Sequence, residues 1–333
     1  MIFLFGWFWL LVFALVVCAL IVAALSWAAQ RRHPPIGTFI DVRGVRLHYL
    51  ECGPSDGEAV VFLHGNGGMI QEQTPSGAPD LAARRYRVLC FDRPGYGYST
   101  RPRFSLWTPE NQAELFAAAF RQLGLGSVIV VGHSWGAMVA AALALQAPDV
   151  VRGVLLASGY YFPTARKDVW MFAGPAVPIV GDLFRFTIAP LLGRLAVWKL
   201  LDVAFAPQPM PDVFRAEYPV GLALRPLSLR ASAEEAAYMI PSAARLQSRY
   251  GELPCPVVIM FGEEDRVIEP DQSRRLQQAI PRAVSRPVSD AGHMVHYADP
   301  KRLVDGIHLL AGWKDVAGQA GAAKRTGEQD AVS

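Results

Sequence analysis

One serine of this chain has neighbours that could turn it into a nucleophile. Ser134 lies in the pentapeptide Gly132-His133-Ser134-Trp135-Gly136, which fits the pattern G-x-S-x-G. A serine hydroxyl attacks a carbonyl carbon only when a base takes its proton, and that base needs a third group to fix its tautomer. The pattern is short enough to occur by chance, so the surrounding sequence must decide between a nucleophile and a plain tight turn.

The sequence around Ser134 favours a sharp turn between a strand and a helix. Residues 128–131 form a continuous apolar run, typical of a strand buried on both faces of a parallel sheet. Residues 137–146 are rich in Ala and Leu, lack Gly and Pro, and precede Pro148, as expected of a helix. Such a turn holds its central residue in a sparsely populated backbone conformation and lifts the serine hydroxyl clear of the sheet.

The acid of a Ser-acid-His set should follow the serine, in a loop after a later strand. Asp265 comes just after the apolar run PVVIMFG, whereas the loop LASGYYFPT, one strand earlier, contains no carboxylate. Glu263 and Glu264 are alternatives to Asp265. We expect Asp265 to be the acid, because its position relative to the strand end and to Pro270 suits the turn.

The histidine should come last, again after a strand. His293 directly follows Gly292 in the loop DAGH, just after the short strand-like run SRPVS. His296 is three residues away and is the alternative, although we expect it to begin the next helix or to pack beneath the site. His48 and His308 are expected to be structural or surface residues. We therefore expect His293 to be the base.

A tetrahedral intermediate also needs two preorganised donors for its oxyanion. One should be the backbone N–H of Trp135, the residue after the nucleophile. The other should come from the glycine-rich loop HGNGG at residues 64–68, where we choose Asn66. The loop could also be a plain turn and Trp135 a packing aromatic, but main-chain donors are compatible with both interpretations.

Strand-like runs alternate with helical stretches on both sides of Ser134, which predicts an α/β fold with a mostly parallel sheet flanked by helices. A strand pair turning at Arg43-Gly44 precedes them. From residue 159 the strand pattern stops and Pro, Arg, Leu and aromatic residues dominate until about 250, which indicates an inserted helical segment. The expected divisions are an anchor (1–30), a first core part (31–158), a cap (159–250), a second core part (251–313) and a disordered tail (314–333).

The N-terminus predicts a membrane segment. Residues 2–29 carry no charge, and a bilayer is crossed by about 20 apolar residues in a helix. A cleaved signal peptide is the alternative, with Ser26-Trp27-Ala28 as cleavage site, but the apolar run is longer than an ordinary signal core and no Lys or Arg precedes it. Arg31 and Arg32 follow the span, so the positive-inside rule predicts a single-pass protein with a cytoplasmic catalytic domain.

Composition excludes some other classes. The net charge is +3 without any basic block, which argues against binding to nucleic acid. The four cysteines have no C-x-x-C spacing, so we expect reduced thiols rather than a disulfide or zinc framework. The H-E-x-x-H spacing of zinc hydrolases does not occur. The sequence leaves the oligomeric state open.

The stretches HGNGG, FDRPGYGYS, GHSWGAM, FGEEDRVIEP and DAGHMVHYADP follow one another in an order and spacing that resemble the α/β-hydrolase fold family. The resemblance covers roughly residues 38–313 apart from the insertion. It implies a Ser-Asp-His triad at Ser134, Asp265 and His293, a helical cap over residues 159–250, and neither a metal nor an organic cofactor.

The identity of the nucleophile limits which reactions of this family are expected. The family's haloalkane dehalogenases and most of its epoxide hydrolases use aspartate at the turn, whereas Ser134 indicates acyl transfer and, first of all, hydrolysis of a carboxylic ester. Carbon–carbon bond hydrolysis, a perhydrolase side activity and removal of an N-terminal proline remain as alternatives from the same fold. For the removal of an N-terminal proline, the sequence resembles the proline iminopeptidases in the motif Gly-x-Ser-Trp-Gly. Those enzymes usually have glycine at the position of His133. They hold the substrate's amino terminus with cap carboxylates, here Glu217, Glu234 or Glu235.

A catalytically silent, membrane-tethered scaffold is the alternative from another class, and the complete set of triad residue types argues against it. The expected substrate is a small-molecule apolar ester that partitions into or near the bilayer. The reason is that an anchored cap with few acidic residues carries many aromatics, namely Trp170, Phe172, Phe184, Phe186, Trp198 and Phe205.

Overall fold

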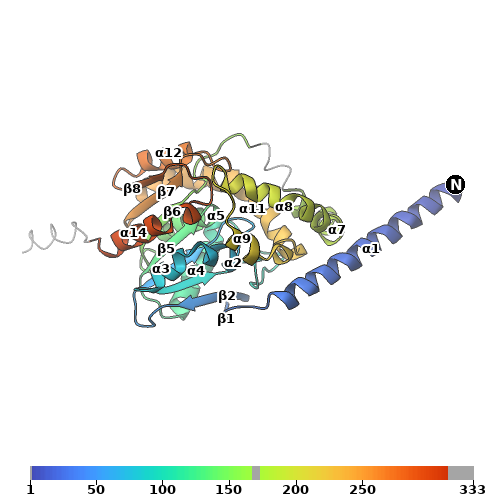
Figure 1. The fold of residues 1–333 in the computed structure, drawn as a ribbon, viewed down its shortest axis with the longest axis horizontal. Helices are drawn as coiled ribbons and strands as arrows, with labels where there is room; N and C mark the ends of the chain where they lie inside the picture. Colours follow the sequence, from blue (N-terminus) through green and yellow to red (C-terminus); the bar gives the residue numbers. More distant parts are fainter. Residues whose placement is uncertain (1, 167–172, 314–333) are drawn as a thin grey trace, which may run out of the picture.

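An eight-stranded sheet forms the centre of the molecule in the computed structural model, which describes residues 2–166 and 173–313 (Figure 1). The strand order is β1-β2-β4-β3-β5-β6-β7-β8. Strands β3 to β8 run parallel, whereas β2 pairs antiparallel with β1 and β4. The strands are β1 (Thr38–Val42), β2 (Val45–Cys52), β3 (Ala59–Leu63), β4 (Arg87–Phe91), β5 (Val128–His133), β6 (Val151–Ala157), β7 (Val257–Gly262) and β8 (Val284–Val288).

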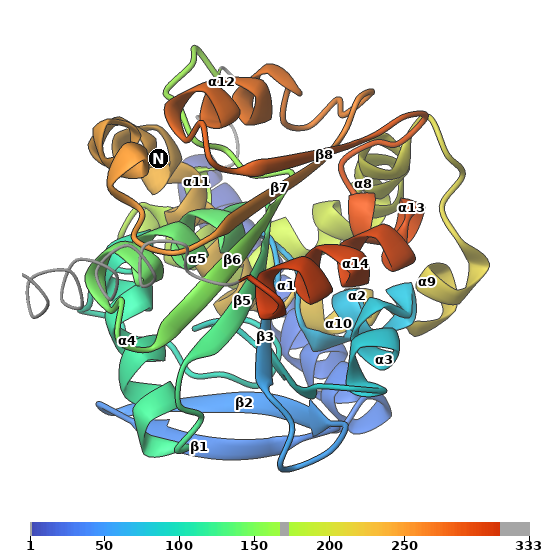
Figure 2. The same cartoon turned by 90° about the vertical axis from the view of Figure 1, so that its left-hand side faces the viewer.

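Helices cover both faces of the sheet, as the alternation of elements predicts. Figure 2 shows α4 (Pro109–Gln122) and α5 (Trp135–Gln146) on one side and α3 (Ala78–Ala83) and α14 (Pro300–Ala311) on the other. Alternate side chains of β5 pack into two hydrophobic cores, one on each face of the sheet. Val128 and Val130 belong to the cluster that includes residues of α4 and α5, whereas Ile129 and Val131 belong to the cluster on the opposite face. The continuous apolar run of β5 follows from this double burial.

The local structure agrees with the sequence-based expectations at some positions and differs from them at others. Arg43 and Gly44, with φ of 49° and 77°, form the turn between β1 and β2. Helix α5 begins at Trp135, two residues earlier than expected, because the chain turns sharply at Ser134 and enters the helix at once. The pattern did not predict the short helices α3 and α12 (Asp271–Ala279). The remaining short elements are α2 (Ile70–Gln73), η1 (Thr74–Ser76), η2 (Gly174–Ala176), η3 (Gln247–Glu252) and α13 (Val295–Ala298).

Between β6 and β7 the described chain is helical, and we refer to this segment as the cap. Its helices are α7 (Val180–Thr187), α8 (Ala189–Phe205), α9 (Asp212–Glu217), α10 (Val220–Ala223) and α11 (Pro226–Leu246). Trp170 and Phe172 lie outside the described residues, and so does the tail 314–333. Phe205 is buried in a cluster with Phe214 and Leu222, whereas Phe184 and Phe186 are exposed.

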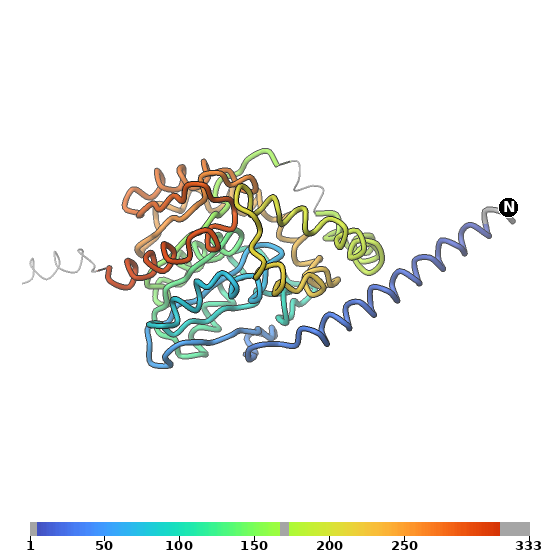
Figure 3. The backbone as a smooth tube through the Cα atoms, in the orientation of Figure 1, coloured from blue at the N-terminus to red at the C-terminus, as the bar shows by residue number. Residues whose placement is uncertain are grey.

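Helix α1 (Ile2–Arg32) projects from the body of the protein (Figure 3). It is the one helix among the described residues that is long and apolar enough to cross a membrane. Its C-terminal part packs on the cap, with Val22 and Ala29 buried against the protein. Gly221 of α10 lies so close to Ala29 that an added Cβ would come within 2.7 Å of the Ala29 Cβ.

Candidate active site

Ser134 lies at the sharp turn between β5 and α5. Its φ of 52° and ψ of −117° are in a region that residues with side chains rarely adopt. Holding a non-glycine residue there costs about 1–3 kcal/mol, and such strain clusters at functional sites. The Ser134 side chain is partly accessible at the N-terminus of α5, which is the position expected of a nucleophile.

Two glycines make the turn possible. A Cβ on Gly132 would lie 2.3 Å from the carbonyl oxygen of Gly136. A Cβ on Gly136 would lie 2.2 Å from the carbonyl oxygen of Leu63 in β3. Neither contact can exist, so α5 can pass this close to β5 and β3 only with glycine at both positions.

The structure pairs His293 with Asp265. Nδ1 of His293 donates to Oδ2 of Asp265 at 2.8 Å, and both side chains are buried. The other carboxylate oxygen, Oδ1, accepts from the backbone N–H groups of Val267 and Ile268 at 2.8 and 2.9 Å. The loop after β7 therefore holds the carboxylate, and the carboxylate holds the imidazole with its Nδ1 protonated.

The residues considered as alternatives to Asp265 and His293 make other contacts. Glu263 and Glu264 are exposed, and Glu263 accepts from the Ser289 hydroxyl at 2.6 Å. His296 is buried in α13, where its Nε2 hydrogen-bonds to Oε1 of Glu72 at 2.8 Å. It lies in the first turn of the helix that follows His293, which is one of the two positions expected from the sequence.

The loop at residues 64–68 lies against Ser134. A Cβ on Gly65 would be 3.0 Å from the Ser134 Cβ and 3.5 Å from its Oγ. The side chain of Asn66 is bound to the cap, because its Nδ2 donates to the Ser232 carbonyl oxygen at 2.9 Å. This contact holds the side-chain amide against the cap, so the backbone N–H of Asn66 is the group that we consider as the oxyanion donor. Trp135 is buried and is the first residue of α5, where backbone N–H groups have no partner within the helix.

Arg93 fixes the orientation of this loop. Its Nε donates to the carbonyl oxygen of His64 at 2.7 Å and its Nη2 to that of Gly65 at 2.8 Å. In a trans peptide the N–H points opposite to the C=O. The N–H of Asn66, which shares its peptide with the Gly65 carbonyl, is therefore turned away from Arg93. Arg93 was not among the site residues predicted from the sequence, although it lies in the motif FDRPGYGYS.

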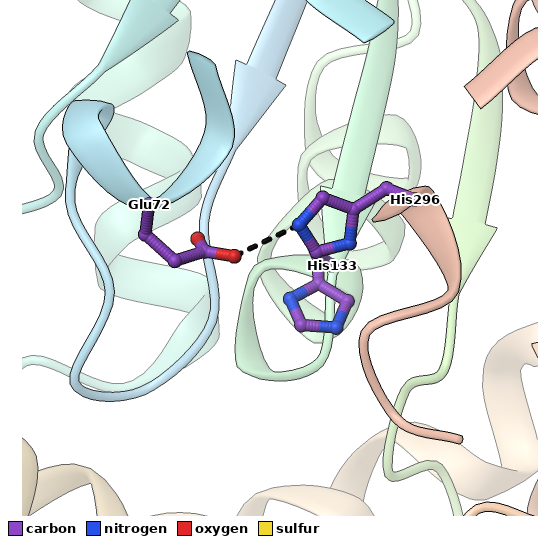
Figure 4. A group of neighbouring side chains, drawn as sticks. All are labelled: Glu72, His133 and His296. Carbon is purple, nitrogen blue, oxygen red and sulfur yellow. Dashed lines mark hydrogen bonds and ion pairs between the residues drawn. The ribbon is translucent and has the colours of Figure 1, made fainter. Parts of the chain in front are cut away.

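A second group of buried polar residues includes His133, the residue before Ser134 in the sequence (Figure 4). The His133 ring lies between those of His293 and His296, with centroids 4.8 and 4.5 Å away. Its Nε2 donates to the His293 carbonyl oxygen at 3.0 Å. Burial, followed by the nearby His296 and His293, holds the pKa of His133 well below its usual range. Glu72 and His296 are the other members of this group, and Glu72 was not among the site residues predicted from the sequence.

Comparison with known proteins identifies the family to which the chain belongs. Residues 58–300 match the family described as alpha/beta hydrolase fold. The chain belongs to the α/β-hydrolase fold family. A haloalkane dehalogenase of Mycobacterium marinum is 28% identical over 281 residues, which cover 80% of this chain and 89% of that protein. As a member of this family, the chain is a hydrolase.

Two further similar proteins are named for other activities. A 2-hydroxymuconate semialdehyde hydrolase of Pseudomonas putida is 26% identical over 285 residues, covering 83% of this chain and 94% of that protein. The solved structure of a membrane phospholipase A, described as a bacterial virulence factor, has a TM-score of 0.64 and 22% identity. The alignment covers 93% of this chain and 97% of the phospholipase chain. At this level of identity, the similarity shows a shared α/β-hydrolase fold.

Proposed function

We propose that this protein is a membrane-anchored serine hydrolase that cleaves an apolar carboxylic ester through an acyl-enzyme. The observation that carries the proposal is the buried His293–Asp265 hydrogen bond, in a loop whose His293 carbonyl oxygen accepts from His133, the residue before the strained, partly accessible Ser134. A nucleophile, a base and a group that fixes the base's tautomer are the parts that acyl transfer needs.

In the proposed reaction, the Oγ of Ser134 attacks the ester carbonyl carbon while Nε2 of His293 takes the hydroxyl proton. Asp265 keeps Nδ1 protonated and stabilises the imidazolium. The backbone N–H groups of Trp135 and Asn66 bind the oxyanion. The imidazolium then gives its proton to the departing alkoxide. A water molecule, deprotonated by His293, hydrolyses the acyl-Ser134 ester and restores the serine.

The side chains at the cap disfavour the proline-peptidase alternative. Glu235 is fully buried against Arg93, and Glu234 is paired with Arg101 at 2.7 Å, so neither carboxylate is free to hold an amino terminus. Glu217 is exposed. Carbon–carbon hydrolysis stays a second candidate, because it needs the same triad and one relative with this activity aligns over most of the chain.

The packing of α1 supports an uncleaved anchor. Its 31 residues, at about 1.5 Å each, span about 46 Å, whereas a hydrocarbon core is about 30 Å thick. The excess matches the C-terminal part that packs on the cap through Val22 and Ala29. The Tyr98 hydroxyl also donates to the backbone carbonyl of His33. Cleavage after Ala28 would remove Val22 from this contact.

The cap surface beside α1 supports a lipid-facing site. Helix α7 contacts α1, and α7 and α8 expose large apolar side chains. An apolar patch of this kind marks an interaction surface. If α1 crosses the bilayer, α7 lies at its surface. The exposed side chains include Ile179, Val180, Leu183, Phe186, Leu192 and Leu195.

A fluorophosphonate probe tests the chemistry, because it reacts only with an activated serine. We expect the wild-type protein to be labelled at Ser134, and the Ser134→Ala variant to remain unlabelled. Labelled protein should lose its activity on p-nitrophenyl esters. A folded wild-type protein that neither reacts with the probe nor cleaves esters or proline nitroanilide would indicate the silent scaffold instead.

Membrane anchoring and orientation are tested separately. The full-length protein should stay in the membrane fraction after a carbonate wash and should retain its N-terminal residues in an intact-mass measurement. A green fluorescent protein fused to the C-terminus should fluoresce, because that end is expected in the cytoplasm. A mature N-terminus near Ala28 would mean a secreted protein and would overturn both assignments.

A further inference from the structure

The group Glu72, His133 and His296 has the composition of a metal site. One potential ligand atom from each residue lies within 4.8 Å of the other two. All three side chains are more than nine-tenths buried. Among the described residues, the buried atoms of this group that have no hydrogen-bond partner include Oε2 of Glu72 and Nδ1 of His133. Buried polar atoms normally have partners, so this concentration of unpaired atoms needs an explanation.

Hydrogen bonding identifies the free electron pair of His133. Its Nε2 faces the carbonyl oxygen of His293, which can only accept, so Nε2 carries the proton. In the neutral ring, Nδ1 then has a lone pair, and no described residue donates a hydrogen bond to it. A metal-binding histidine commonly donates its second N–H to a backbone carbonyl in this way, which fixes the ring and its tautomer.

The carboxylate and the second imidazole face the same space. Figure 4 shows the Glu72 carboxylate and one nitrogen of each imidazole turned toward one another. Two glycines of the loop at residues 64–68 border this space. A Cβ on Gly65 would be 3.2 Å from Nδ1 of His133, and a Cβ on Gly68 would be 2.9 Å from Oε2 of Glu72. Larger residues at these two positions would crowd the atoms that a cation would use.

We propose that Glu72, His133 and His296 bind one divalent transition-metal ion of the zinc class. Two imidazoles and a carboxylate suit zinc or cobalt, whereas magnesium and calcium prefer oxygen ligands alone. The ion binds Nδ1 of His133, Nε2 of His296 and a carboxylate oxygen of Glu72, which requires that Nε2 of His296 releases its proton or passes it to Nδ1.

The proposed ion has a positioning role and takes no part in bond cleavage. It connects α2, the end of β5 and α13, which lie next to the Gly65 loop, Ser134 and the His293 loop respectively. The triad chemistry of the proposed function does not depend on it, so failure of one proposal leaves the other standing. The family resemblance implies no metal, and nothing in G-x-S-x-G indicates this site.

Cobalt uptake by the full-length protein tests the proposal. Protein in detergent, without a histidine tag, is stripped with a chelator, incubated with Co²⁺ or Zn²⁺, desalted and analysed for bound metal. We expect one ion per chain, the strong visible absorption of four-coordinate Co²⁺, and a higher melting temperature with Zn²⁺ than with chelator.

Matched variants locate the ion. Glu72→Gln and His296→Gln should weaken binding by at least about 100-fold, whereas His308→Gln, at an exposed histidine, should bind like wild type. Equal binding by all variants would place the metal elsewhere and overturn the proposal. If the ligand variants do not fold, the wild-type protein decides, because absence of both uptake and a melting-temperature shift also overturns it.

Discussion

Arg93 and Glu235 form an ion pair in which neither side chain is exposed to solvent. Arg93 follows β4 in the core and Glu235 lies on α11 of the cap, and Nη2 of Arg93 donates to Oε2 of Glu235 at 3.0 Å. The Tyr96 hydroxyl and the Gln112 amide also donate to this carboxylate, at 2.8 and 3.0 Å. The guanidinium that orients the carbonyls of the Gly65 loop is thus neutralised by the cap, which connects cap docking with the proposed oxyanion site.

Removing the charge of one member of this buried ion pair should destabilise the folded protein. In Glu235→Gln the buried Arg93 charge loses its counter-charge, and we expect the free energy of unfolding to fall by about 3–5 kcal/mol. Glu114→Gln is the matched control, since Glu114 and Arg43 are paired on the surface with side chains 59% and 61% exposed. The control should change stability by less than about 1 kcal/mol in the same urea titration. Equal losses in the two variants would contradict the role given to burial.

The triad assignment predicts a sharp contrast between neighbouring histidines. Ser134→Ala and His293→Ala should each lower kcat for an ester by on the order of 10³-fold or more, because triad members act as a unit. His296→Ala should be mild by comparison, since the ring of His296 hydrogen-bonds to Glu72 rather than to Asp265. Circular dichroism of each variant controls for folding. Activity kept in His293→Ala and lost in His296→Ala would reverse the assignment.

The parts of the site that the sequence predicted are local or ordered along the chain. Ser134 was predictable because an apolar run, two glycines and an Ala-rich helix surround it within a few residues. The Asp265–His293 pairing was predictable because parallel strands bring their following loops to the same edge of the sheet. The roles of these residues stay proposals until they are tested.

The parts that the sequence did not predict depend on contacts between distant segments. Arg93 and Glu235 are 142 residues apart, and Glu72 and His296 are 224 residues apart. Periodicity cannot reveal such pairs, because each residue taken alone looks like an ordinary charged residue in a loop or on a helix. The interpretation of Glu235 as a substrate-binding carboxylate arose in this way, since its burial against Arg93 appears only when the cap is docked.

A buried neutral histidine should make stability depend on pH. His64 accepts from the Arg93 N–H through Nε2 at 2.9 Å and donates from Nδ1 to the Gly65 carbonyl at 2.7 Å, so its neutral form is fully bonded. Burial, followed by the Arg93 charge, holds the pKa of His64 well below its usual range. Below about pH 6.5 the unfolded chain therefore binds a proton that the folded chain does not.

From this linkage we expect stability to be highest above about pH 6.5 and to fall below it by at most about 1.4 kcal/mol per pH unit for each of the buried neutral histidines His64 and His133. Urea unfolding at about pH 6.5 and about pH 5.5 measures this slope in a range where most carboxylates stay ionised. His64→Gln should reduce the slope, whereas the exposed His308→Gln should leave it unchanged. A free energy of unfolding that rises on acidification would contradict the neutral state of His64.

The length of the acyl chain tests the apolar substrate. Ligand sites are mostly apolar walls with a few polar groups at the chemistry, and the described cap next to α1 is rich in apolar side chains. Each buried methylene contributes about 0.8 kcal/mol, which corresponds to about a four-fold gain. If the pocket holds the acyl chain in the transition state, kcat/KM should climb by a few-fold per added carbon from acetate to medium-chain p-nitrophenyl esters, and then level off when the pocket is full. Assays below the critical micelle concentration of each ester keep substrate aggregation out of the comparison. A profile that peaks at acetate and falls steadily with chain length would rule out a lipophilic pocket and favour a small ester or an amide as the substrate.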